Sequence, residues 1–186
     1  MEDNIIKKIA KQILAKTSIK LSGFWPSDFS ISFMRRYNKI QLSAEQLLAV
    51  SEAVKRKAPC KLLVFGLGND SAFWAYLNRD GVTVFLEDNR NWFEEITGKS
   101  KKIKAFLIDY NTKRKDWRTY LNNPSLLSMP LPDDVEKEQW DVILVDAPAA
   151  YQDENSGRMK SIFLSSKLIG NSGDIFVHDC DREVED

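Results

Sequence analysis

Five short, nearly continuous apolar runs divide most of the chain. They cover residues 62–65, 82–86, 103–108, 141–145 and 175–178. Runs of this length are typical of parallel strands that are covered on both faces. Because segments with helical patterning separate them, the order of elements predicts an α/β fold with a mainly parallel sheet and helices on both faces.

Helix signals lie between the runs. Ser43 and Gln46 form a capping box that opens a helix to about residue 57. Three further helices are predicted, over residues 70–78, 91–97 and 157–169. Gly98 is expected to cap the second of these three helices, and residues 171–174 predict a turn before the last strand. Residues 113–139 hold three prolines and predict irregular structure with a short helix near 116–121.

The first 42 residues predict a separate helical cap. Residues 3–16 are amphipathic, with isoleucines on one face and lysines mostly elsewhere, and we expect this helix to pack on the domain rather than on a membrane. Residues 21–41 are rich in aromatic side chains and predict a short helix after Pro26. This segment covers the edge of the sheet or, alternatively, closes over a pocket. The chain is therefore divided into a cap, 1–42, and a Rossmann-like domain, 43–186.

Composition narrows the class of protein. A chain of 186 residues with 43% hydrophobic residues can form one well-cored domain. Its 27 basic and 27 acidic residues cancel, so no overall field attracts nucleic acid. No apolar run is long enough for stable membrane insertion, and the start has no signal-peptide pattern, which together predict a cytoplasmic protein. Cys60 and Cys180 are expected to be two buried thiols without a disulfide.

A glycine turn follows the first predicted strand. Gly66 and Gly68 allow a sharp turn and a close approach to a ligand, and Asn69, Asp70 and Ser71 lead into the next helix. Glu87 lies 21 positions after Gly66, at the spacing where a carboxylate binds ribose hydroxyls.

Two cofactors fit this spacing. The dinucleotide pattern requires a third small glycine-like position, where Ser71 stands, and an acidic residue such as Asp70 disfavours a pyrophosphate. A carboxylate suits the cationic sulfonium and amino groups of S-adenosylmethionine. The turn therefore favours S-adenosylmethionine, with a nicotinamide oxidoreductase as the alternative.

Polar side chains also end the other strands. Asp109 ends the third strand, Asp146 the fourth, and His178 and Asp179 the fifth. Because parallel strands end at the same edge of a sheet, these groups should meet there. Asp146 is expected to orient an acceptor hydroxyl or take its proton, supported by His178 and Asp179. The same three residues could instead bind a metal ion through oxygen ligands and water, although their spacing does not require one.

Several stretches together resemble a known family. They are residues 59–71, Phe85–Asp88 with Trp92, Trp140–Pro148 with Tyr151, Gly157–Met159, and Phe176–Asp179 with Arg182–Glu185. This set resembles the plant polysaccharide-biosynthesis methyltransferases, namely the glucuronoxylan 4-O-methyltransferases and their arabinogalactan relatives. The resemblance covers about residues 43–186.

The resemblance implies a class I S-adenosylmethionine-dependent O-methyltransferase that modifies the 4-hydroxyl of glucuronic acid on a polysaccharide or oligosaccharide acceptor. It implies that Gly66, Gly68, Asp70 and Ser71 hold the methionine part of the cofactor and that Glu87 holds the ribose. Asn69 in the glycine turn and Asp109 at the end of the third strand are also expected to bind the cofactor. Asp146, His178 and Asp179 would be catalytic, and Tyr151 and Arg158 would contact the acceptor.

The chain also departs from this family. Members usually carry a membrane anchor and lie in the Golgi, and their sheet continues beyond the last predicted strand, so the closing strands are expected to be missing here. Asn69–Ser71 is moreover a glycosylation sequon inside the expected cofactor turn. The alternative function is therefore a non-catalytic family member that acts as a scaffold in polysaccharide biosynthesis.

Overall fold

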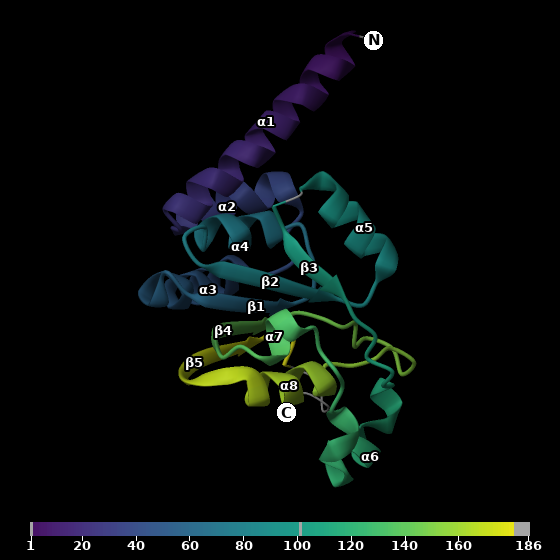
Figure 1. Cartoon of the computed structure of the whole chain (residues 1–186). Helices are drawn as coiled ribbons and strands as arrows, with labels where there is room; N and C mark the ends of the chain where they lie inside the picture. The colour runs from purple at the N-terminus through teal and green to yellow at the C-terminus, as the bar shows by residue number, and fades with distance from the viewer. Residues whose placement is uncertain (1, 101, 181–186) are drawn as a thin grey trace.

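The computed structural model describes residues 2–100 and 102–180. Five parallel strands form one sheet in the order β3-β2-β1-β4-β5 (Figure 1). The strands are β1 (Lys61–Phe65), β2 (Val82–Glu87), β3 (Lys104–Leu107), β4 (Trp140–Val145) and β5 (Ile169–Val177). The prediction of an α/β fold with a parallel sheet is confirmed.

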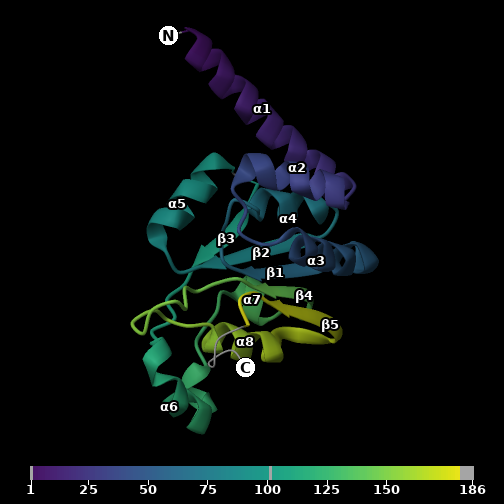
Figure 2. The ribbon, with the colours of Figure 1, turned by 180° about the vertical axis from the view of Figure 1, so that it is seen from behind.

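Helices cover both faces of the sheet. Alternate β1 residues point to opposite faces, so Leu62 and Val64 belong to one core cluster and Leu63 and Phe65 to the other. The first cluster packs beneath α2 (Asp28–Asn38), α3 (Ala44–Lys57), α4 (Ser71–Leu77) and α5 (Arg90–Lys99). The second packs against α7 (Asp133–Glu136) and α8 (Met159–Leu168). Figure 2 shows the same layers from behind.

The predicted helices correspond to α2, α3, α4, α5, α6 (Trp117–Asn122) and α8. The capping box of α3 is present, because Ser43 Oγ accepts from the Gln46 amide and the Gln46 side chain accepts from the Ser43 amide. Residues 113–139 hold more structure than expected, since the 3-10 turn η1 (Arg114–Asp116) leads into α6 and a second 3-10 turn, η2 (Pro124–Leu127), lies between α6 and α7.

Three local predictions were wrong. Gly98 lies inside α5, which continues to Lys99 and is capped by Ser100. The expected turn at 171–174 is instead an irregular part of β5. There the chain advances five positions, from Ile169 to Asp174, while β4 advances two, from Trp140 to Val142. Cys60 is buried as expected, but Cys180 is exposed because it follows the last strand into a surface loop.

The N-terminal helix α1 (Glu2–Phe24) does not pack on the domain along its length. It contacts α2 and α4 through its second half, and its first half projects from the body in both ribbon views (Figure 1, Figure 2). Ile5, Ile6, Ile9 and Ile13 are each more than half exposed. The expected packing of the isoleucine face is therefore wrong. In the described part of the chain, no helix is both long and apolar enough to cross a bilayer.

The strand order positions a site. The order reverses between β1 and β4, and at such a switch point the loops after two neighbouring strands leave in opposite directions and open a crevice. Asp146 and Ala147, which follow β4, both donate their amides to the carbonyl oxygen of Phe65, at 2.9 and 2.8 Å. The glycine turn after β1 is thus held beside the end of β4.

Candidate functional site

A cavity of about 640 Å³ opens at this crevice. Its walls come from the glycine turn, the end of β2, the segment after β4 and the connection between α2 and α3. Nine of the predicted site residues line the cavity, and they come from the glycine turn, the end of β2 and the segments after β4 and β5. They are Gly66, Gly68, Asn69, Asp70, Glu87, Asp146 and Asp179, joined by the predicted acceptor contacts Tyr151 and Arg158.

The glycine turn leaves no space for side chains. Gly66 has φ +119°, and a Cβ there would lie 3.0 Å from the Ala147 Cβ. A Cβ on Gly68 would lie 2.4 Å from Asp70 Oδ1. Ser71, predicted to hold the cofactor, is buried and does not line the cavity; its Oγ accepts from the Gly68 amide at 2.8 Å. Ser71 therefore holds the shape of the turn.

Glu87 joins the glycine turn to the end of β2. One carboxylate oxygen accepts from the Leu67 amide at 2.7 Å and the other from the Asn89 amide at 2.8 Å. Burial raises the pKa of this carboxyl. A carboxylate offers about four acceptor positions, so Glu87 keeps capacity for a ligand such as a pair of ribose hydroxyls. The bonds from the Leu67 and Asn89 amides fix the orientation of the Glu87 carboxylate beside the glycine turn.

Asp70 lies against the glycine turn. It is buried, and Oδ2 accepts from the indole nitrogen of Trp74 at 2.9 Å. Burial, with the nearby charge of Asp146, raises the pKa of Asp70 to about 6. A buried carboxylate with this raised pKa would be stabilised by a cationic ligand group. This fits the ammonium or sulfonium group of S-adenosylmethionine.

Asp146 and His178 form a short contact at the ends of β4 and β5. His178 Nδ1 lies 2.6 Å from Asp146 Oδ1, and Nε2 lies 3.1 Å from Asp179 Oδ1. The hydrogen bond to Asp146 is the main cause that raises the pKa of His178. His178 does not itself line the cavity, whereas Asp146 and Asp179 do. Asp146 therefore lines the cavity, and the imidazole of His178 lies behind it.

Arg158 has different partners from those expected. Its terminal nitrogens donate to the carbonyl oxygens of Asp146 and His178, at 2.9 and 2.5 Å, and contact Asp179 Oδ2 at 3.3 Å. The side chain is only 5% exposed. Arg158 lines the cavity, but its guanidinium group is bonded to the ends of β4 and β5. A bidentate pair with the carboxylate of a sugar would therefore have to replace these bonds.

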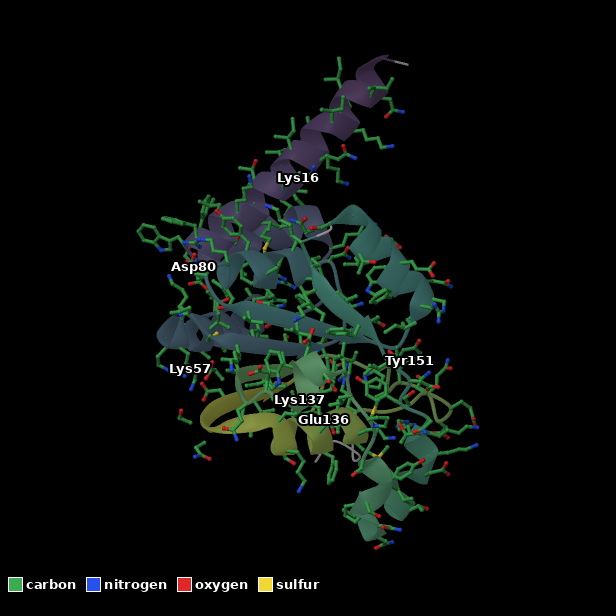
Figure 3. The ribbon with its side chains drawn as sticks, in the orientation of Figure 1. Lys16, Lys57, Asp80, Glu136, Lys137 and Tyr151 are labelled. Atoms are coloured by element: carbon green, nitrogen blue, oxygen red, sulfur yellow. The ribbon has the colours of Figure 1, made fainter. Side chains whose placement is uncertain are left out.

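The three remaining predicted site residues lie at different positions relative to the cavity. Tyr151 is 71% exposed beside the cavity, on the loop after β4, where Figure 3 labels it. Asn69 lies at the rim, and its side-chain amide donates to the Lys39 carbonyl at 3.4 Å. Asp109, predicted to bind the cofactor, does not line the cavity; its carboxylate accepts from the Asn111 amide.

Some residues that line the cavity were not among the predicted site residues. Asp88 and Trp92 follow Glu87 closely, and the Trp92 indole donates to the Leu67 carbonyl, which places an aromatic ring beside the turn. Both residues could have been predicted to line the site, because they follow directly after the second strand. Lys39, Ile40 and Gln41 line the cavity, which agrees with the alternative prediction that residues 21–41 close over a pocket. Leu42 completes this wall, and the packing of α2 on α3 holds the connection over the cavity.

The structure gives no support to the metal alternative. Over residues 2–100 and 102–180, no group of three or more His, Cys, Asp or Glu side chains is arranged to hold a metal ion. Of the stretches that carried the family resemblance, residues 182–185 lie outside the described part of the chain.

Comparisons with known proteins show the family of this chain. The family model IRX15/IRX15L/GXM matches residues 45–126 and 122–186. Glucuronoxylan 4-O-methyltransferase 2 of Arabidopsis thaliana is 35% identical over 181 residues, which cover 86% of this chain and 62% of the relative. Arabinogalactan O-methyltransferase 2 of the same plant is 36% identical over 170 residues, covering 78% of this chain and 58% of the relative.

Two further proteins are similar to this chain, one by sequence and one by structure. Protein IRREGULAR XYLEM 15 of Arabidopsis thaliana is 33% identical over 180 residues, covering 81% of this chain and 55% of the relative. The solved structure of the CcbJ methyltransferase from Streptomyces caelestis overlaps 82% of this chain, and 51% of its own, with a TM-score of 0.44 and 14% identity. The chain spans less than two thirds of the length of the three plant relatives. With its family model matched over nearly all of residues 45–186, this chain belongs to the IRX15/IRX15L/GXM family, which includes glucuronoxylan and arabinogalactan O-methyltransferases.

Proposed function

We propose that this chain transfers a methyl group from S-adenosylmethionine to a sugar hydroxyl, with the 4-hydroxyl of glucuronic acid on xylan or arabinogalactan as the preferred acceptor. One observation carries the proposal. The glycine turn, Glu87 and the Asp146 carboxylate line the same cavity, so a cofactor site and a proton-accepting group face one space. The similarity to methyltransferases of glucuronoxylan and arabinogalactan supports the choice of acceptor.

The residues present fit the cosubstrate. The tight turn at Gly66 and Gly68 lets a ligand approach the backbone, and Glu87 would accept from the ribose hydroxyls. Asp70 would lie near the cationic end, and the Trp92 ring would cover an aromatic base. When bound, S-adenosylmethionine supplies an electrophilic methyl group, which leaves the sulfonium as the acceptor oxygen attacks.

The chain's own part in the reaction is positioning and proton removal. Holding the acceptor oxygen in line with the methyl group removes most of the entropic cost of the step. Asp146 would accept the hydroxyl proton, and the imidazole of His178, at 2.6 Å, would orient that carboxylate. Arg158 fixes the backbone beneath both residues through its bonds to their carbonyl oxygens.

The acceptor would lie toward the rim. Five carboxylates line the cavity, namely Asp70, Glu87, Asp88, Asp146 and Asp179. This charge suits a cationic cosubstrate but repels an acidic sugar. Among the described lining residues Lys39 is the only lysine, and it is exposed. We therefore assign contact with the sugar carboxylate to Lys39, and contact with the sugar ring to Tyr151.

Transfer of labelled methyl from S-adenosylmethionine to a panel of glucuronic-acid-bearing xylan and arabinogalactan oligosaccharides tests the proposal. Asp146→Asn should reduce the rate by about 100-fold or more, because an amide cannot take the proton, while cosubstrate affinity stays within about two-fold. Glu136→Gln, an exposed side chain at the end of α7, is the control and should keep full activity. Cosubstrate binding without transfer to any acceptor would instead support the scaffold function.

A further inference from the structure

The projecting helix α1 exposes a line of apolar side chains, with Lys20 on the same side between Ile13 and Phe24. Ile6 and Ile13 are seven residues apart, about two helical turns, and Phe24 follows Ile13 by eleven residues, about three turns. With Ile9 beside them, these side chains form a ridge, and each member is more than half exposed. Trp25, directly after the helix, is 68% exposed. Monomeric proteins rarely expose so many large apolar side chains together, so the ridge requires a partner.

The ridge faces away from the body of the protein. Ser22 follows Ile13 by nine residues, about two and a half turns, and so lies on the opposite side of α1. On that opposite side the helix is attached to the body: Ser22 Oγ donates to the Ser30 carbonyl at 2.7 Å, and the Asn38 amide donates to Ser18 Oγ at 3.1 Å. The body therefore leaves the ridge open to an extended surface.

The charge of α1 identifies the partner. From residue 4 to residue 24 every charged side chain is a lysine, and there are five: Lys7, Lys8, Lys11, Lys16 and Lys20. Figure 3 labels Lys16 on this helix. A second copy of the helix would bring two lysine-rich segments together, whereas an anionic lipid surface would attract them. Lysine stems can also extend along apolar surface while the ammonium groups reach the phosphates.

We propose that α1 lies on the surface of a bilayer that contains anionic phospholipids, with the ridge inserted at the level of the headgroups. Lys7, Lys8 and Lys11 lie on the side of the helix away from Ile13, whereas Lys16 and Lys20 flank the ridge. An amphipathic helix that combines an apolar face with lysines binds such surfaces without crossing them. Phe24 and Trp25 suit the boundary between headgroups and acyl chains, and the Arg79 guanidinium, 5.7 Å from the Phe24 ring, adds a cation there. The family match begins at residue 45, so this inference is independent of the proposed methyl transfer.

Co-sedimentation of the whole chain with vesicles tests this proposal. Binding to phosphatidylcholine vesicles that contain phosphatidylserine should be about ten-fold or more stronger than binding to phosphatidylcholine alone. The double variant Ile6→Ser and Ile13→Ser should lose about ten-fold in affinity for the anionic vesicles. The control, Asn4→Ser, lies nine residues before Ile13 and so on the opposite side of the helix, and it should stay within about two-fold. Circular dichroism checks that all variants keep their helices.

Two results would overturn the proposal. One is equal binding of the wild type and the isoleucine variant to the anionic vesicles. The other is absence of vesicle binding together with a dimer in analytical ultracentrifugation that the isoleucine variant loses, because the ridge would then join two copies of the chain.

Discussion

Asp70 is a buried carboxylate whose ionisation opposes folding. Its pKa is about 6 in the folded chain against an ordinary value of 3.8, mainly because of burial. The folded chain therefore holds a proton between these values that the unfolded chain has lost, so the free energy of unfolding falls as pH rises from about 4 to about 6. Asp70→Asn, which keeps an acceptor for Trp74, should raise this free energy by roughly 2 kcal/mol at neutral pH and flatten that part of the pH profile.

Thermal unfolding across that pH range measures this effect. Asp80→Asn is the matched control, because Asp80 is largely exposed, as Figure 3 shows, and should change little. A variant at Asp70 that is less stable than the wild type at neutral pH would show that the carboxylate is paired with a group that compensates its burial.

In the proposed mechanism, His178 should set the pH dependence of proton removal. Its contact with Asp146 raises the pKa of the imidazole above its ordinary value of 6.5. While the imidazole is protonated, the Asp146–His178 pair is less able to accept the acceptor proton, so kcat should rise with pH through a midpoint above 6.5. His178→Gln should remove this rise and reduce kcat by about ten-fold or more. Identical profiles for both proteins would contradict the positioning role.

At the scale of elements, the connection between α2 and α3 forms a wall of the cavity. Lys39 lies there with φ 48°, and Ile40 and Leu42 anchor the connection in the core. Lys39→Gln should raise KM for glucuronic-acid acceptors by roughly three- to five-fold, since an exposed ion pair contributes up to about 1 kcal/mol. KM for a neutral glucose-bearing acceptor should not change.

Steady-state kinetics with the two acceptors separates charge recognition from general damage. Lys102→Gln is the control, because Lys102 precedes β3 at the opposite edge of the sheet. Equal changes of KM for acidic and neutral acceptors would contradict the assignment of Lys39.

Some strands and helices could be predicted from the sequence, and others could not. The strands after Cys60 and Trp140 were predictable because each buries both faces, and the capping box at Ser43 marks its helix by local chemistry. The irregular start of β5 could not be predicted, because pairing with β4 outweighs the turn propensity of residues 171–174. Similarly, the isoleucines of α1 predict a helix, but nothing in their spacing reveals what they contact.

At the scale of the whole molecule, the strand order brings the site together. Gly66, Glu87 and Asp146 were identifiable because parallel strands end at one edge, so residues far apart in sequence share that edge. The partners of Arg158, the position of Asp109 outside the cavity and the wall made by Lys39 depend on tertiary packing, which no local pattern encodes.

The most direct test of the central claim is titration calorimetry with S-adenosylmethionine. The wild type should bind, and Glu87→Ala should weaken the affinity by about ten-fold or more, because the ribose hydroxyls lose their acceptor and the glycine turn loses its bond at Leu67. Glu136→Ala, outside the cavity, should bind as the wild type does. Unchanged affinity in Glu87→Ala, or absence of binding to the wild type, would contradict the assignment of this cavity to the cosubstrate.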